Sequence, residues 1–168
     1  MLESVSELFL NYGVRSVSMD DIARELGISK KTIYQNFSDK DDLVKQATEL
    51  VLKDRQAEFD EIEQRAENSI EEQVMISKCI RKEFKEMNPS LMFDIQKYHP
   101  ESWNLFLKHE KEVIEASVRR SLNRGIKEGY FRPEIDVEVL ARLRVQEIHL
   151  SFNDKIFPKK EYDLKELQ

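Results

Sequence analysis

The segment from Ser29 to Phe37 contains the side chains best suited to bind a charged ligand. It carries Lys30 and Lys31 next to each other and no acidic residue. Hydroxyl and lysine side chains bind phosphate, lysine can also bind guanine, and glutamine and asparagine can bind the edge of adenine. The segment adds hydroxyl and amide groups at Thr32, Tyr34, Gln35 and Asn36. This composition favours a surface that binds the phosphates and base edges of duplex DNA.

A catalytic or metal site is not expected in this sequence. The three histidines, His99, His109 and His149, do not have the spacing of metal ligands, and the single cysteine, Cys79, has no base close to it in the sequence. No glycine-rich loop that could hold a phosphate is present. We therefore predict that the protein is not an enzyme and that it has no metal and no cofactor.

The composition is typical of a helical soluble protein. Charged residues make up 36% of the 168 residues, and there are only 4 glycines and 4 prolines. No apolar run approaches the ~20 residues that a membrane helix needs. Met1 leads directly into an amphipathic pattern, so we expect no signal peptide and no membrane partner. With one cysteine no internal disulfide is possible, and we expect a cytoplasmic location.

The net charge of −6 restricts how such a protein could bind DNA. DNA-binding domains often have a basic excess, and this chain has the opposite. Any affinity for DNA must therefore come from a local basic surface, for which Lys30 and Lys31 are the candidates.

Capping residues and glycines divide the chain into predicted helices. Ser18 with Asp21 forms a capping box, and Gly27 ends the helix that this box begins. Ser38 with Asp41 and Ser69 with Glu72 repeat the same pattern. We predict helices over about 2–12, from Ser18 to Gly27, 30–36, from Ser38 to about 66, 69–87, from Pro89, from Pro100 to about 128, and from Asp136 to about 153, with a further helix possible in the tail after Ile156.

The second and third predicted helices have the features of a helix-turn-helix. Ala23 is the small residue needed where the two helices cross, and Gly27 suits the tight turn between them. Apolar side chains that would hold the pair together occur at Ile22, Leu26, Ile28 and Ile33. The polar side chains from Lys30 to Asn36 would then form the outer face of the second helix of the pair.

In these residues the sequence resembles the N-terminal domain of TetR-type regulators over about residues 2–47, without gaps. The matching positions are Leu8-Phe9, Gly13, Ser18, Ile22-Ala23, Gly27-Ile28-Ser29, Thr32-Ile33-Tyr34, Phe37, Lys40 and Leu43. The resemblance implies an all-α fold with a three-helix DNA-binding domain over 1–47. It also implies a helical ligand-binding and dimerisation domain over 48–168.

The resemblance also implies roles for single residues. Ser18, Tyr34 and Lys40 would contact phosphates, and Asn36 would contact a phosphate or a base edge. Ser29 would be a contact as well, although Ser18 and Ser29 are good helix caps in any protein. The residues implied to face the major groove are Lys30, Lys31, Thr32 and Gln35. Many family members have glycine at the position of Lys31, so this lysine adds charge and could change the base preference.

Aromatic and methionine side chains are dense between residues 84 and 107, where the resemblance implies a ligand cavity. Such side chains line adaptable apolar pockets, and they also fill ordinary cores. The predicted ligand-binding residues are Arg81, Phe84, Phe93, Tyr98, His99, Trp103, Phe106 and His149.

The last predicted helix is apolar on two sides, which indicates that it is covered on two sides. One side carries Val137, Leu140, Ala141, Val145 and Ile148, and the other carries Val139, Leu143 and Leu150. A second copy of the chain would cover one of them, so we predict a homodimer.

Together these features predict a repressor that binds a palindromic operator in double-stranded DNA. A small, largely apolar effector would release it by moving the long fourth helix, which joins the two domains. Two alternatives are an enzyme and a helical interaction module whose helix-turn-helix no longer binds DNA. Retention of Lys30, Lys31, Tyr34 and Lys40 argues against the second alternative.

Overall fold

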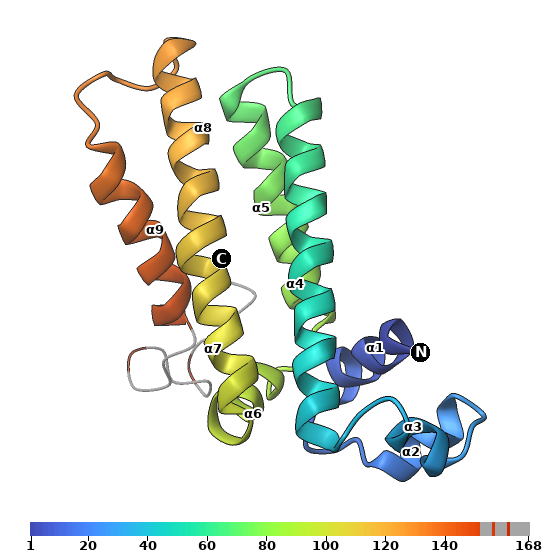
Figure 1. Cartoon of the computed structure of the whole chain (residues 1–168). Coiled ribbons are helices and arrows are strands. Elements are labelled where there is room, and N and C mark those ends of the chain that lie inside the picture. Colours follow the sequence, from blue (N-terminus) through green and yellow to red (C-terminus); the bar gives the residue numbers. More distant parts are fainter. Residues whose placement is uncertain (152–155, 157–160, 162–168) are drawn as a thin grey trace. The chain divides into compact units, whose positions relative to one another are not determined.

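The computed structural model describes residues 1–151, 156 and 161, and its regular structure in this part of the chain is helical throughout (Figure 1). The all-α prediction is confirmed. The elements are α1 (Leu2–Tyr12), α2 (Met19–Glu25), α3 (Lys30–Tyr34), α4 (Lys40–Arg65), α5 (Ser69–Glu86), α6 (Leu91–Tyr98), α7 (Pro100–His109), the π-helical turn η1 (Glu110–Ile114), α8 (Glu115–Lys127) and α9 (Val137–Ser151).

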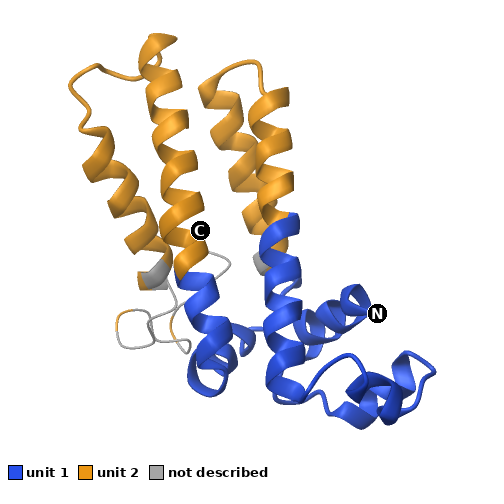
Figure 2. Ribbon diagram, viewed as in Figure 1, with its two compact units in different colours: residues 1–54, 86–107 blue, residues 55–85, 108–168 orange. Residues whose placement is uncertain are grey.

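The chain divides into two compact units (Figure 2). Unit 1 comprises residues 1–54 and 86–107, and unit 2 comprises residues 55–85 and 108–168. The predicted domain boundary at residues 47 and 48 differs from this division, because unit 1 also includes α6 and most of α7. Helix α4 begins in unit 1 and ends in unit 2. None of the described helices is both long enough and apolar enough to cross a membrane.

Apolar side chains at helical spacing form the core of unit 1 around α1, α2 and α3. Ile22 on α2 and Ile33 on α3 are fully buried, as a helix-turn-helix requires. Burying a side chain of this size contributes roughly 1.5–3 kcal/mol. The other buried apolar residues of this region are Val5, Phe9, Val14, Val17, Phe37, Leu43, Val44 and Ala47.

Local capping explains where α2 begins, and here the sequence prediction is confirmed. Ser18 Oγ accepts a hydrogen bond from the backbone N–H of Asp21 at 3.2 Å, and the Asp21 carboxylate accepts one from the Ser18 N–H at 3.0 Å. These bonds from Ser18 lower the pKa of Asp21. Asp136 caps α9 in a similar way, by accepting from the Val139 N–H at 3.1 Å. Pro100 is the first residue of α7, as predicted.

The start of α4 is one residue later than predicted. Asp39 caps the helix by accepting from the Asp42 N–H at 2.8 Å, and Asp42 accepts from the Ser38 N–H at 2.9 Å. The predicted box of Ser38 with Asp41 is therefore wrong. Asp41 is instead exposed and lies beside His99, with 2.7 Å between Asp41 Oδ1 and His99 Nδ1.

The cap of α5 is also misplaced by one residue, here in the opposite direction, although the helix begins at Ser69 as predicted. Asn68 Oδ1 accepts from the N–H groups of Ile70 and Glu71, both at 3.0 Å, and the Glu71 carboxylate accepts from the Glu67 N–H at 2.7 Å. The predicted box of Ser69 with Glu72 is therefore wrong. The beginning of α6 also differs from the prediction: it starts at Leu91, and Pro89 lies in the turn before it, where Asn88 Oδ1 accepts from the Ser90 N–H at 2.9 Å.

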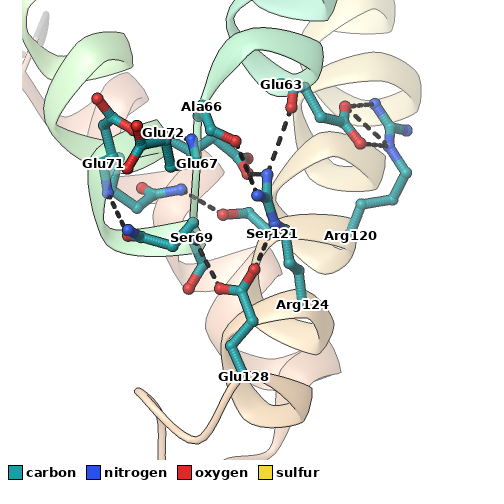
Figure 3. Close-up of polar contacts among 12 residues, drawn as sticks. Glu63, Ala66, Glu67, Ser69, Glu71, Glu72, Arg120, Ser121, Arg124 and Glu128 are labelled. Carbon is teal, nitrogen blue, oxygen red and sulfur yellow. Dashed lines mark hydrogen bonds and ion pairs between the residues drawn. The ribbon is translucent and has the colours of Figure 1, made fainter.

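Within unit 2, Arg124 of α8 joins the turn between α4 and α5 to α8 (Figure 3). Its guanidinium donates to the carbonyl oxygens of Ala66 at 2.8 Å and Glu63 at 3.3 Å. These carbonyls end α4, where a positive charge is favourable. The same guanidinium forms ion pairs with Glu72 at 3.3 Å and with Glu128 at 2.7 Å.

The carboxylates around Arg124 extend this network. Glu72 is almost completely buried, and burial raises its pKa. Glu128 accepts from the Ser69 N–H at 2.7 Å, so it binds the first turn of α5 as well as Arg124. Arg120 adds an ion pair with Glu63 at 2.9 Å (Figure 3). A buried carboxylate is tolerated here because a guanidinium faces it.

The segment from Pro100 to Lys127 was predicted as one helix and contains a π-helical turn, η1. Turns of this kind are rare and often occur at functional positions. Helix α9 then packs against α8 and η1 and buries Ala141 and Val145. The predicted extension of α9 to Asn153 and the helix after Ile156 fall on residues that are mostly outside the described ones.

Candidate nucleic-acid interface

Helix α3 is anchored by one side chain and leaves a polar face exposed. Ile33 is fully buried, whereas Tyr34 is 50% exposed. Thr32 is half-buried. The exposed predicted residues of α3 and its flanks are Ser29, Lys30, Lys31, Gln35 and Asn36. The structure thus places this part of the predicted set together on one short helix and the residues beside it.

Several of these polar groups already have partners within the chain. Ser29 Oγ caps α3 by accepting from the Thr32 N–H at 3.1 Å, and Asn36 Nδ2 donates to the Thr32 carbonyl at 3.0 Å. Lys30 Nζ lies 3.0 Å from Asp20 Oδ1, and hydrogen bonding to this aspartate raises the pKa of Lys30. No acidic partner of Lys31 is found among the described residues. Lys31 therefore contributes the unopposed positive charge of this surface.

Lys40 has a structural role that the sequence did not indicate. Its ammonium donates to the carbonyl oxygens of Val14 at 2.7 Å and Val17 at 2.6 Å. Burial lowers the pKa of Lys40. An ammonium has three N–H donors, so one is left over after these two bonds. A phosphate contact by Lys40 stays a prediction.

The predicted ligand-binding residues are distributed over both units. Arg81 is exposed on α5 in unit 2, and the remaining described side chains of the set lie in unit 1. Trp103 and Phe106 stack with their ring centres 5.2 Å apart. Phe93 and Tyr98 are 43% and 40% exposed. The side chains of Phe84 and His149 lie outside the described ones, so their roles stay predictions.

A polar pocket of about 460 Å³ lies in unit 1 between the first turns of α4 and α7. It contains His99, and Lys45 pairs across it with Glu101 at 2.9 Å. Its other lining residues are Ser38, Asp39, Asp41, Asp42, Pro100 and Ser102. The lining is polar and charged, unlike the apolar pocket that the sequence predicted around the aromatic residues.

Sequence reasoning missed a group of half-buried and buried polar side chains in unit 2. Arg55 of α4 forms an ion pair with Glu83 of α5, and both side chains are half-buried. His109 Nε2 is buried, and no hydrogen-bond partner for it is found among the described residues. Burial lowers the pKa of His109 and raises that of Glu110 to about 8. Burial likewise raises the pKa of Cys79 to about 12.

These residues do not form a metal site. Among the described residues there is no group of three or more histidine, cysteine, aspartate or glutamate side chains placed to hold a metal ion.

Comparison with known proteins supports the assignment of the helix-turn-helix. Residues 2–47 match the model of the bacterial regulatory proteins of the tetR family. The segment that contains the helix-turn-helix is thus similar to the N-terminal part of this family.

Two relatives extend the similarity beyond this segment. The HTH-type transcriptional regulator YvaF of Bacillus subtilis is 30% identical over 60% of this chain and 55% of its own length. The HTH-type transcriptional repressor KstR2 of Mycobacterium tuberculosis is 25% identical over 84% of this chain and 72% of its own length. The chain thus spans little more than half of the first relative.

Solved structures show the same fold over nearly the whole chain. A TetR-family transcriptional regulator from Agrobacterium tumefaciens aligns with a TM-score of 0.73 and 17% identity, covering 97% of this chain and 87% of that one. The transcriptional regulator FadR from Bacillus subtilis, in complex with stearoyl-CoA, aligns with a TM-score of 0.63 and 18% identity, covering 99% and 90%.

The buried carboxyl of Glu110 makes a testable prediction about pH. Its pKa is about 8 in the folded chain and near 4.5 when exposed, so the folded state favours the protonated form. The contribution of this group to stability is fully present below pH 4.5 and is lost as the pH rises through 8. The E110Q variant lacks this titration. In thermal unfolding, its melting temperature should match that of the original protein at pH 5 and exceed it at pH 8.5.

The control for this measurement is E112Q, which changes an exposed carboxylate on the same π-helical turn. Its melting temperature should differ from that of the original protein by the same small amount at both pH values. A difference between E110Q and the original protein that does not change with pH would contradict a raised pKa at Glu110.

Proposed function

We propose that the protein is a transcriptional repressor that binds a palindromic operator as a homodimer through α3. The observation that carries the proposal is the orientation of this helix: Ile33 is buried, and Lys31, Tyr34 and Gln35 are exposed. The matched segment of the TetR family includes all of these residues. Helices of this type enter the major groove, where their outer side chains contact base edges. A regulator that binds chromosomal DNA would act in the cytoplasm.

The side chains divide into two classes of contact. Gln35 has an amide that can form two hydrogen bonds with adenine, and Lys31 can bind guanine or a phosphate. Ser18, Ser29 and Tyr34 have hydroxyl groups that suit phosphates, which fix position without specifying sequence. Further polar groups of the proposed interface are Lys30, Thr32, Asn36 and Lys40.

Replacing Lys31 or Tyr34 by alanine tests the interface. A duplex selected from a random library by the original protein serves as the probe, and fluorescence anisotropy gives the affinity. Loss of one good base or phosphate contact costs about 1–3 kcal/mol, so each variant should bind roughly 5- to 150-fold more weakly. The control is K53A, an exposed lysine on α4 that lies outside the proposed interface. Unchanged affinity for both K31A and Y34A would show that α3 is not the recognition helix.

Helix α9 supports the proposal of a homodimer. Its side toward α8 buries Ala141 and Val145, while Val139 and Leu143 are 51% and 52% exposed. Leu140 and Leu150 are also exposed on this helix. Exposed apolar side chains gathered on one helix are typical of a surface that a second subunit covers.

The L143E variant tests this surface. A charge at the centre of an apolar interface is costly to bury, so the variant should be monomeric at concentrations where the original protein is dimeric. Analytical ultracentrifugation measures the mass. Q146E, at an exposed polar position of the same helix, should remain dimeric. A monomeric original protein would remove the homodimer from the proposal.

We further propose that a small, largely apolar effector releases the protein from DNA. FadR of Bacillus subtilis was solved with stearoyl-CoA, and KstR2 is named a repressor, which is the support that relatives provide. Helix α4 runs from unit 1 into unit 2, so a change in unit 2 could be passed to the helix-turn-helix along it. A ligand shifts this equilibrium only by its preference for the released state.

The effector is tested with a panel of fatty acids and acyl-CoA esters. A compound that raises the melting temperature of the protein should also lower its affinity for the selected duplex. Compounds that stabilise the protein and leave the affinity for DNA unchanged would contradict release by an effector. An interaction module that no longer binds DNA is the remaining alternative, and it would show no salt-dependent binding to any duplex.

A further inference from the structure

We propose that Arg15 and Lys97 form a second phosphate-binding site of unit 1, which contacts the backbone of the same DNA that α3 binds. This inference rests on the proposed DNA-binding function and adds a contact outside the helix-turn-helix. Arg15 lies in the loop between α1 and α2, and Lys97 lies near the end of α6. Neither residue is among the predicted DNA-binding residues.

Both cations lie over the same aromatic ring. Arg15 Cζ is 5.4 Å from the centre of the Tyr98 ring, and Lys97 Nζ is 5.1 Å from it. Lys97 Nζ is also 5.4 Å from the ring centre of Phe93. These distances are within the range of cation–π attraction, which holds a cation in place without a counter-charge. All of these side chains are exposed, so both positive charges face solvent.

The basic residues of unit 1 differ in whether a carboxylate opposes them. Arg24, Lys30 and Lys45 pair with Asp21, Asp20 and Glu101 at 3.2, 3.0 and 2.9 Å. Lys40 is directed at backbone carbonyls. Among the described residues no acidic side chain pairs with the remaining cations of unit 1, which are Arg15, Lys31, Lys53 and Lys97. The ring of Tyr98 therefore brings together two of the unopposed charges.

The loop that carries Arg15 is held in position on both of its sides. Lys40 binds the carbonyl oxygens of Val14 and Val17, which flank it. The loop then leads to Ser18, the cap of α2 and a proposed phosphate contact. Arg15 is thus close in sequence to one end of the proposed interface, on a segment with little freedom to move.

The turn before α6 is hydrogen-bonded to the end of α1, which places Lys97 of α6 near the loop that carries Arg15. The Asn88 N–H donates to the Leu10 carbonyl at 2.7 Å. Gly13 has φ +79°, and a Cβ at this position would lie 2.9 Å from Ser90 Oγ. A side chain is therefore excluded from Gly13 both by the backbone conformation and by the close approach of the turn before α6. These contacts within unit 1 join the segments that carry the two halves of the site.

The phosphate backbone of duplex DNA is the partner that these observations favour. Acidic residues outnumber basic ones in unit 1. A polyanion that is not already held by α3 would therefore be repelled by most of the surface of unit 1. DNA that is already bound by α3 would reach a basic site on the loop that leads to Ser18 without further cost in translational freedom. Arginine and lysine side chains that face solvent suit phosphates, which carry no sequence information.

The salt dependence of DNA binding tests this site with the R15Q/K97Q double variant. Each phosphate contact contributes about 0.9 to the slope of the logarithm of affinity against the logarithm of salt concentration. The slope should become shallower by about 1.8 for the double variant. Affinities for the selected duplex and for a random duplex of equal length should fall by the same factor, because phosphates do not report sequence.

Three further variants separate the possible explanations. K53Q removes another unopposed lysine of unit 1 and should leave the slope unchanged. R15K/K97R keeps both charges and should keep the original slope; a reduced slope here would show that packing on Tyr98 matters rather than charge, and would overturn the proposal. K31Q weakens binding if the proposed function is right.

The outcomes for the site and for the function are distinguishable. An unchanged slope for R15Q/K97Q together with weakened binding by K31Q would overturn the second phosphate site and leave the DNA-binding function standing. Absence of salt-dependent DNA binding by the original protein would overturn both. Circular dichroism and thermal unfolding verify that the variants are folded, which is expected because the side chains of Arg15 and Lys97 are exposed.

Discussion

The proposed interface depends on a half-buried lysine at the start of α4. The ammonium of Lys40 replaces hydrogen bonds to water by bonds to the carbonyl oxygens of Val14 and Val17. A buried ammonium without such acceptors would cost several kcal/mol, so the loop between α1 and α2 is held where those acceptors lie. This loop precedes the capping box of Ser18, which begins α2. The orientation of α2 and α3 relative to α4 within unit 1 is therefore linked to one charged group.

Local rules predicted those parts of the fold that depend on few neighbours. The sequence predicts the start of α2 and the start of α7 correctly, because each has only one candidate start signal. These signals are the box of Ser18 with Asp21 and Pro100. The caps of α4 and α5 were misplaced because the sequence offers two candidate capping residues at each helix. At α4, Asp42 is as suitable as Asp41 for the carboxylate of a capping box. At α5, Asn68 directly precedes Ser69, and both residue types are good helix caps. Tertiary structure is consistent with capping of α5 by Asn68 instead of by the box of Ser69 with Glu72. The Glu72 carboxylate pairs with Arg124, which is distant in the sequence.

The functional residues likewise include some that the local sequence predicts and some that depend on tertiary packing. The exposure of Lys31, Tyr34 and Gln35 follows from the position of Ile33 on a short helix, which the sequence specifies. The ion pair of Arg55 with Glu83 and the burial of Glu110 could not be predicted. A charged residue in a helical pattern normally belongs to a solvated face, and only the packing of another helix turns that face inward. A π-helical turn likewise has no recognisable sequence signal here.

The distribution of opposed and unopposed cations offers a physical reason for an acidic protein to bind DNA selectively. Lysines next to carboxylates, such as Lys30 beside Asp20, contribute little to the attraction of phosphates. A cation on an aromatic face keeps its full charge and is still held in place, as Lys97 is on Tyr98. In the proposed function, the acidic remainder would weaken binding to arbitrary DNA, because the sequence-independent part of the affinity is electrostatic. A few fixed cations near base-reading side chains would then raise the share of affinity that depends on sequence.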